Sequence, residues 1–244
     1  MATITNQPIS FKSISFGHLP QGLAPLAQID QLTIQQKGNL LEGLTRCAAR
    51  SKYEIFNSLN QQVYYAKEES SCCMRCWCGP YRGFIIHIMD NNGQEVMTMT
   101  RELRCCGGCC WCADGSCGFL LKVEAPPGNV VGYCKQRTSC CVLHMELMDA
   151  GMQPLFKIWG PCCPFCHCIC CPHDVSFPVK DIYNPDKVKA NIARTWTGLG
   201  DVIKERDTFQ VTFPLEMDVK QKVIIIGAAF LVEFIAFEIV KHTR

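Results

Sequence analysis

The sequence ends in an almost unbroken apolar run, residues 223–240, which follows closely on an acidic stretch, residues 205–216. Eighteen residues form a helix about 27 Å long at about 1.5 Å per residue, slightly less than the roughly 30 Å hydrocarbon core of a bilayer. Glu233 and Glu238 lie inside the run, and a carboxylate near the centre of a membrane-spanning helix costs about 2.5–3.5 kcal/mol. The run therefore predicts either a single membrane span or a helix that is apolar on all sides and buried in the protein, for example inside a β-barrel. The residues that represent this membrane or core helix are Val223, Gly227, Phe230, Glu233, Phe234 and Val240.

The acidic stretch carries carboxylates at intervals similar to those of a calcium-binding loop. Glu205, Asp207 and Glu216 match the first, third and twelfth positions of an EF-hand loop, which are ligand positions. That loop needs glycine at its sixth position, where this chain has Gln210. We therefore predict a weak, partly formed Ca²⁺ site, and the alternative is a set of solvated carboxylates at a strand end. The candidate metal residues are Glu205, Asp207, Thr208, Phe209 and Glu216, with Asp218 as a further oxygen donor.

Composition and the N-terminal sequence limit the class of protein. The 244 residues are 48% hydrophobic and carry a net charge of +2, which predicts one main domain and argues against nucleic-acid binding. Residues 1–16 lack a basic segment followed by a long apolar one, and Ala2 stands where N-myristoylation needs glycine. We therefore expect the chain to stay on the cytosolic side, where thiols are mostly reduced.

Twenty cysteines then need an explanation other than a disulfide scaffold. Sixteen of them fall into three groups, within residues 72–78, 105–117 and 162–171. C-x2-C pairs in these groups, with His167 and His173 near the third, are compatible with Zn²⁺ sites. Clustered cytosolic cysteines are also acceptors for S-palmitoylation, and two acyl chains anchor a protein firmly. Isolated cysteines such as Cys47 and Cys134 are expected to be inert buried thiols.

Short segments of period-two hydrophobicity closed by turn signals predict β-hairpins through most of the chain. The Asn-Gly pair in residues 90–93 is the strongest of these signals. The expected hairpins are residues 52–65, 84–100, 119–136 and 142–159, and further strands are expected at residues 175–179, 196–203 and 207–213. So many short strands predict a mainly β protein, either an antiparallel sandwich or a closed barrel.

Two helices are expected to interrupt this pattern, at residues 28–45 and at residues 223–240. Residues 1–25 are polar with scattered proline and glycine, which predicts a short disordered tail. The folded domain is therefore expected to extend over residues 26–244 and to include the C-terminal helix. The chain has no G-x-S-x-G, H-E-x-x-H, P-loop or G-x-G-x-x-G motif, so no catalytic residues are predicted and covalent catalysis is not expected.

Taken together, these segments make the chain resemble the phospholipid scramblase family. The residues that carry the resemblance are 26–32 (LAQIDQL), 52–55 (KYEI), 91–96 (NNGQEV), the cysteine-rich run after Arg104, 124–128 (EAPPG), 158–162 (IWGPC), 196–198 (WTG), and 213–215 (FPL) through 218–220 (DVK). They occur in the same order over about residues 20–240.

The resemblance implies a Tubby-like, closed antiparallel barrel of about twelve strands around the hydrophobic C-terminal helix. It also implies a membrane-associated protein of the cytoplasmic face of the plasma membrane that moves phospholipids between leaflets in both directions, without ATP, when Ca²⁺ binds. The family's Ca²⁺ segment falls on residues 205–216. Its palmitoylated cysteines fall on Cys105, Cys106, Cys109, Cys110 and Cys112.

The leading functional hypothesis is thus a palmitoyl-anchored, Ca²⁺-responsive scramblase that acts on a phospholipid membrane without covalent chemistry. One short helix cannot provide a polar path through hydrocarbon alone, so homo-oligomers or local disturbance of the bilayer are expected. Two alternatives remain open. One is a palmitoyl-anchored lipid-binding or adaptor protein without intrinsic scrambling, and the other is a zinc-binding regulatory domain that uses the cysteine groups.

Overall fold

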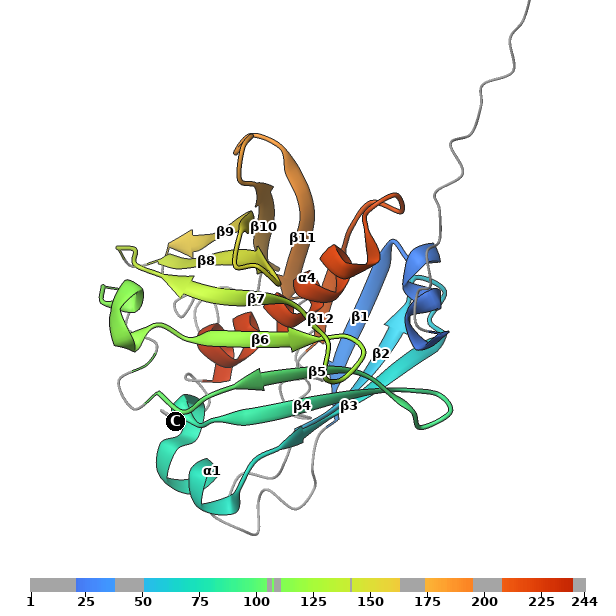
Figure 1. Cartoon of the computed structure of the whole chain (residues 1–244), viewed down its shortest axis with the longest axis horizontal. Helices are drawn as coiled ribbons and strands as arrows, with labels where there is room; N and C mark the ends of the chain where they lie inside the picture. Colours follow the sequence, from blue (N-terminus) through green and yellow to red (C-terminus); the bar gives the residue numbers. More distant parts are fainter. Residues whose placement is uncertain are drawn as a thin grey trace, which may run out of the picture.

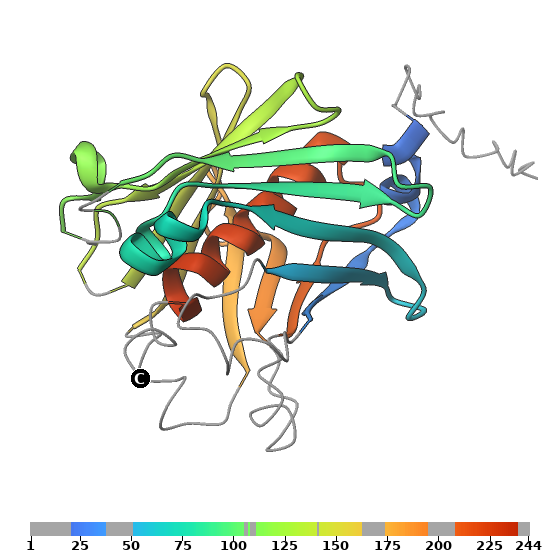
Figure 2. The ribbon, with the colours of Figure 1, turned by 90° about the horizontal axis from the view of Figure 1, so that it is seen from below.

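Twelve antiparallel strands close into a barrel that surrounds the C-terminal helix (Figures 1 and 2). The computed structural model describes residues 21–37, 51–104, 107, 111–140, 142–162, 174–194 and 208–238. Each strand pairs with its neighbours in sequence, and β1 closes the barrel by pairing with β12. The expected mainly β architecture with a hydrophobic C-terminal helix is therefore confirmed, and the barrel replaces the sandwich alternative.

The barrel is a simple up-and-down sequence of strands. The strands are β1 Gln31–Gln36, β2 Lys52–Asn57, β3 Gln62–Glu69, β4 Phe84–Asp90, β5 Glu95–Arg101, β6 Leu120–Glu124, β7 Val130–Arg137, β8 Val142–Asp149, β9 Pro154–Cys162, β10 Val175–Asp181, β11 Val188–Arg194 and β12 Thr208–Thr212. The helical elements are η1 Gln21–Gln28, α1 Cys72–Cys78, η2 Gly79–Tyr81, η3 Ala113–Cys117, α4 Val219–Val232 and η4 Glu233–Phe237.

The alternation of side chains explains why these segments form a barrel. In β12, Phe209 and Val211 point inward and are buried, while the polar residues between them point outward. The apolar face of a strand must be shielded from water. Closing the sheet around a helix shields the apolar faces of all strands together. The hairpin expected at residues 90–93 forms between β4 and β5, with Gly93 at a φ of +80°. Asp90 Oδ1 accepts hydrogen bonds from the backbone amides of Asn92 and Gln94, each at 2.9 Å.

The C-terminal helix fills the barrel along its interior (Figure 2). Helix α4 starts at Asp218, whose side chain accepts a hydrogen bond from Lys220 N at 2.8 Å. It continues directly into the π-helical turn η4. Every residue of these two elements from Lys222 to Phe237 is buried, so the helix is the centre of the hydrophobic core.

The helix expected at residues 28–45 is wrong where the structure describes it. Residues 21–28 form the 3₁₀ helix η1, and residues 31–36 form strand β1. Leu32 and Ile34 are both buried in β1, which shows a period of two where a helical period was expected. Leu23 and Leu26 of η1 also pack in the core, so residues before position 26 contribute to the packed domain.

The two ends of the barrel differ in their connections. Tight turns join β2 to β3, β4 to β5, β6 to β7, β8 to β9 and β10 to β11 at one end, together with η1 and the start of α4; we call this the turn end. The opposite end carries α1, η2, η3 and the last turn of the helix, and α1 and η3 lie at the left of Figures 1 and 2. We call it the cysteine end, because the strand ends that flank all three cysteine groups lie there.

Candidate functional site

The last turn of the core helix meets a buried ionic cluster at the cysteine end. Glu68 of β3 and Arg82 form a two-pronged pair, with Arg82 Nε 2.7 Å from Oε1 and an Arg82 terminal nitrogen 2.9 Å from Oε2. The other terminal nitrogen of Arg82 lies 2.6 Å from Glu238 Oε1 and 2.8 Å from Gly79 O. Ser70 Oγ donates to Glu68 at 2.7 Å. Because buried charges are tolerated only when they are paired and hydrogen-bonded, this cluster fixes the helix end to the barrel wall.

The charges in this cluster shift one another's pKa values in opposite directions. Burial raises the pKa of Glu68, but the hydrogen bonds and charge of Arg82 outweigh burial, and the pKa lies below its usual value. Burial alone would lower the pKa of Arg82, and the two glutamates raise it instead. For Glu238, burial outweighs Arg82, so its pKa is raised. Glu68 is thus held ionised, whereas Glu238 takes up a proton more readily.

A second arginine, Arg101 of β5, lies beside the cluster among aromatic rings. Its guanidinium carbon is 4.4 Å from the ring centres of both Phe84 and Phe119 and 5.4 Å from that of Phe234. One of its terminal nitrogens donates to Arg82 O at 2.8 Å. Burial lowers the pKa of Arg101, partly offset by Glu238. Aromatic faces are one of the few surroundings that favour a cation away from water, so these rings partly offset the cost of burying the arginine.

The other glutamate of the apolar run also has a partner inside the barrel. Tyr53 of β2 donates its hydroxyl to Glu233 Oε1 at 3.2 Å, and its ring packs edge-on against Phe230 at 5.1 Å. Burial, reinforced by Glu233, raises the pKa of Tyr53 well above its usual value, so the hydroxyl keeps its proton. Each carboxylate that argued against a membrane span therefore has a hydrogen-bond partner in the barrel domain.

The helix start is fixed at the turn end by Lys222. Its ammonium group is fully buried and donates to three backbone carbonyls, Ile29 O at 2.8 Å, Leu26 O at 3.0 Å and Leu215 O at 3.1 Å. It also lies 5.1 Å from the ring centre of Phe213. Burial lowers the pKa of Lys222. This one side chain joins η1, the β12–α4 connection and the core helix.

These contacts decide between the two structures expected for the apolar run. Val223, Gly227, Phe230, Glu233 and Phe234 lie in the core, and residues 239–240, which include Val240, lie outside the described residues. Among the described residues, no helix has the length and apolar character needed to cross a membrane. The buried alternative is therefore the one that the structure supports, and the expectation of a transmembrane helix is corrected.

Of the candidate Ca²⁺ residues, the described ones, Thr208, Phe209 and Glu216, do not lie in one loop. Glu205 and Asp207 lie outside the described residues, Thr208 starts β12, and Glu216 is exposed in the turn before α4. Phe209 points into the core, 5.6 Å from the ring centre of Phe237. Strand β12 separates Thr208 from Glu216, and at about 3.3 Å per residue its five residues extend over about 13 Å. An EF-hand-like set that contains both is therefore not supported by this geometry.

The cysteines of the described residues lie mostly at the surface of the cysteine end. Cys73, Cys112 and Cys140 are exposed free thiols and Cys72 is exposed as well, whereas Cys76 is disulfide-bonded and departs from the expectation of reduced thiols. Cys105, Cys106, Cys109 and Cys110 lie outside the described residues, as do residues 163–173. In the part of the chain that is described, no group of three or more His, Cys, Asp or Glu residues suits a metal ion.

One cysteine inside the barrel behaves as expected of an isolated residue. Cys134 of β7 is fully buried, and its Sγ donates to Ile224 O at 3.4 Å. Burial raises the pKa of this thiol, so it remains protonated. Cys134 is thus a packing residue of the core, and Cys47 lies outside the described residues.

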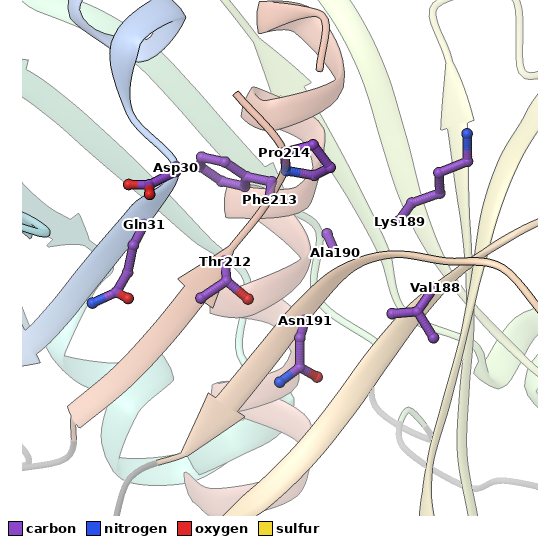
Figure 3. A pocket seen from close by; sticks show the side chains of 9 residues that line it. All are labelled: Asp30, Gln31, Val188, Lys189, Ala190, Asn191, Thr212, Phe213 and Pro214. Carbon is purple, nitrogen blue, oxygen red and sulfur yellow. The ribbon is translucent and has the colours of Figure 1, made fainter. Parts of the chain in front are cut away.

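The outer wall of the barrel carries an unusual uncharged surface over β1, β12 and β11. We call it the polar strip, and it consists of Gln31, Thr33, Gln35, Thr208, Gln210, Thr212 and Asn191. Gln31, Thr212 and Asn191 are direct cross-strand neighbours, as are Thr33 and Gln210. The row that contains Gln31 borders a shallow hollow of about 350 Å³ (Figure 3). These side chains offer hydrogen-bond donors and acceptors without formal charge.

Comparison with known proteins places this barrel in a family. A family model described as Scramblase matches residues 10–239, which include all twelve strands and the described part of the core helix.

The chain belongs to the scramblase family.

Several named scramblases are similar to this chain. Phospholipid scramblase 1 of Homo sapiens is 42% identical over 220 residues, which cover 90% of this chain and 66% of that protein. Phospholipid scramblase 2 of Bos taurus is 41% identical over 224 residues, covering 91% of this chain and 73% of that protein. The human phospholipid scramblase family member 5 is 39% identical over 222 residues, with 90% and 78% covered. This chain spans just under two thirds of the length of phospholipid scramblase 1. No solved structure matches the chain.

Sequence reasoning missed several residues that organise this scramblase-family barrel. The partners of the internal glutamates, Arg82 and Tyr53, come from distant strands and connections, and no local pattern marks them. Lys222 looked like a residue that flanks an apolar run, although its burial ties three elements together. The only available signal was the pair of glutamates inside the run, because buried carboxylates require partners.

Proposed function

We propose that this chain is a membrane-associated phospholipid scramblase, which moves phospholipids between leaflets in both directions without ATP and without forming a covalent intermediate. The observation that carries the proposal is the family match over residues 10–239. It is supported by relatives named phospholipid scramblase at about 40% identity over 90% of the chain. The activity and the membrane location are inferred from these relatives.

The enclosed helix restricts how lipid passage would occur. A headgroup needs polar groups along its route through hydrocarbon, and the interior of the barrel is filled with apolar side chains. The route would therefore run over the outer wall, where the polar strip offers uncharged donors and acceptors. The part of the strip on β12 extends over about 13 Å, against a hydrocarbon core of about 30 Å. One barrel does not bridge that distance, so a second copy or local thinning of the bilayer is part of the proposal.

We place the Ca²⁺ response at the start of β12. Glu205 and Asp207 immediately precede Thr208 in the sequence, and a hard cation favours such carboxylate and hydroxyl oxygens. Glu216 lies beyond the strand and is left out of this set, and Phe209 has no oxygen to offer and is buried. A cation bound here would act on the strand that contains three of the seven residues of the polar strip.

Anchoring is proposed at the cysteine end through acylation of Cys105, Cys106, Cys109, Cys110 and Cys112. The described member of this set, Cys112, is an exposed free thiol. Acyl chains there would hold the barrel at the cytoplasmic face of the plasma membrane, since two chains suffice for stable attachment.

The test is lipid exchange in vesicles that contain the purified full chain and a fluorescent phospholipid in both leaflets. A membrane-impermeant quencher reports lipids that reach the outer leaflet. We expect Ca²⁺ to increase the exchange rate, Glu205→Gln with Asp207→Asn to remove that increase, and Glu216→Gln to retain it. An exchange rate equal to that of protein-free vesicles at every Ca²⁺ concentration would contradict the transport function.

A second candidate function is a lipid-anchored adaptor or lipid-binding module without scrambling. The observation in its favour is the burial of every helix residue from Lys222 to Phe237, which leaves this part enclosed by protein. In the same vesicle assay, membrane binding without lipid exchange would select this function. For the zinc-binding alternative, the described residues contain no group of side chains that suits a metal ion. Metal analysis of the purified chain tests this alternative directly, and stoichiometric zinc would support it.

A further inference from the structure

Two tryptophans at the cysteine end are almost completely exposed to solvent. Trp77 in α1 is 88% exposed, and Trp111, just before η3, is 72% exposed. Large aromatic side chains rarely remain so exposed unless they contact a partner, because burying one removes about 150–250 Å² of surface from water. By comparison, Trp159 is 45% exposed and stacks on His144 at 3.9 Å between ring centres.

Both exposed tryptophans adjoin exposed thiols. Trp77 shares helix α1 with Cys72 and Cys73, and Trp111 directly precedes Cys112. Both views of the molecule place α1 and η3 at the same end of the barrel (Figures 1 and 2). Indole rings prefer the boundary between water and hydrocarbon, where the ring is in contact with lipid and the N–H remains hydrated. Thiols at the same end are suitably placed for acyl chains that enter the same boundary.

We propose that the cysteine end is the surface that docks on a lipid bilayer, with Trp77 and Trp111 inserted in the interface. The core helix then points its last turn, and the buried ionic cluster around Arg82, toward the membrane. This inference rests on the proposed function only for membrane association, and it adds the orientation of the barrel and the residues that make contact.

The turn end is the rival surface, because it also exposes apolar side chains. Leu59, Met152 and Tyr183 are 75%, 51% and 90% exposed at the tips of its turns. These turns contain no cysteine, so no acyl chain can be attached there. Both ends expose carboxylates, Asp30 and Glu216 at the turn end and Glu102 and Asp114 at the cysteine end, so charge does not distinguish them. The thiols therefore favour the cysteine end.

Tryptophan fluorescence in vesicles tests this orientation directly. The chain has four tryptophans, so replacing three of them by phenylalanine leaves a single reporter at Trp77 or at Trp111. The matched control replaces all four by phenylalanine and adds Tyr183→Trp, which puts an equally exposed reporter at the turn end. The vesicles contain phosphatidylcholine and phosphatidylserine with brominated acyl chains, and circular dichroism confirms that each variant is folded.

We expect brominated lipid to quench the Trp77 and Trp111 reporters at least about threefold more than the Tyr183→Trp reporter, because bromine quenches only over short distances within the bilayer. We further expect Trp77→Ala with Trp111→Ala to weaken vesicle binding at least about tenfold, and Leu59→Ala with Tyr183→Ala to leave it nearly unchanged. Equal quenching at both ends, stronger quenching at the turn end, or absence of vesicle binding would each overturn the inference.

Lipid exchange measured in the same vesicles separates this inference from the proposed function. Exchange that proceeds without preferential quenching at the cysteine end would overturn the docking surface and leave the scramblase function standing. Preferential quenching without exchange would support the docking surface and contradict the scramblase function.

Discussion

Arg82 and Glu238 are 156 positions apart in the sequence, and their side chains are joined by a 2.6 Å ion pair. Arg82 follows η2 at the cysteine end, and Glu238 follows the last turn of the core helix. Since Arg82 also holds Glu68 of β3 with two hydrogen bonds, one guanidinium connects the barrel wall to the end of the helix. The position of the helix inside the barrel therefore depends on a charge network as well as on apolar packing.

Removing the charge of Glu68 should destabilise the fold strongly. Glu68→Gln leaves Arg82 buried with only part of its compensation, and breaking a buried ion pair typically costs about 3–5 kcal/mol. The free energy of unfolding, measured by urea denaturation, should fall by an amount in this range. The matched control is Glu69→Gln, because the Glu69 side chain is 62% exposed and pairs only with His87. That variant should lose less than about 1 kcal/mol, and equal losses in the two variants would contradict the role of the cluster.

The same pair predicts how stability depends on pH in acid. The pKa of Glu68 lies below its usual value of 4.5 in the folded protein, so the folded state binds the proton less readily than the unfolded state. Its stabilising contribution is therefore present above the unfolded pKa and is lost as the pH falls through the lower, folded pKa. The urea midpoint of Glu68→Gln should decrease less than that of the wild type between pH 6 and pH 3. Identical pH profiles for the two proteins would show that Glu68 makes no such contribution.

Replacing Lys222 should destabilise the turn end of the barrel. Lys222→Met preserves much of the side chain volume but removes the donor to Leu26 O, Ile29 O and Leu215 O. Leaving a buried carbonyl without its hydrogen-bond donor costs about 1–3 kcal/mol. The free energy of unfolding should therefore fall by at least about 2 kcal/mol. Hydrogen exchange of the amides in η1 should become faster as well. Lys220→Met, two residues earlier in the same helix and exposed, serves as the control and should change neither quantity appreciably.

Close contact between the helix and the wall predicts the effect of a single methyl group at Gly132. A Cβ at this position of β7 would overlap Met148 O and would lie 2.5 Å from Ile224 Cδ1 of the core helix. Gly132→Ala should therefore cost about 1–3 kcal/mol through overpacking, measured as a lower free energy of unfolding. At Gly115, by contrast, a Cβ would have no atom within 4 Å. The free energy of unfolding of Gly115→Ala should therefore lie within about 0.5 kcal/mol of the wild-type value. An unchanged Gly132→Ala protein would indicate that the helix shifts away from β7.

Most strands were predictable because they have a local cause, whereas β1 was predicted as helix and β11 was not predicted. Residues 84–100 alternate between apolar and polar and contain the Asn-Gly turn, and they form β4 and β5 as expected. The helix predicted at residues 28–45 is wrong in its described part because Leu32 lies three residues after Ile29, a helical interval, and two before Ile34, a strand interval. Only the pairing of β1 with β2 and β12 selects the strand. The spacing of the candidate Ca²⁺ residues in the sequence likewise does not reveal that a strand separates Thr208 from Glu216.

The sequence by itself determined that residues 223–240 must avoid water, because a helix that is apolar on all sides has no face to expose. It also determined most of the strands that enclose this helix, through their alternating pattern, with β1 and β11 as the exceptions. Only the tertiary structure decided whether protein or lipid surrounds the helix. Closure of the barrel brings Tyr53 to Glu233 and Arg82 to Glu238, and these long-range partners satisfy the carboxylates that hydrocarbon would leave unpaired.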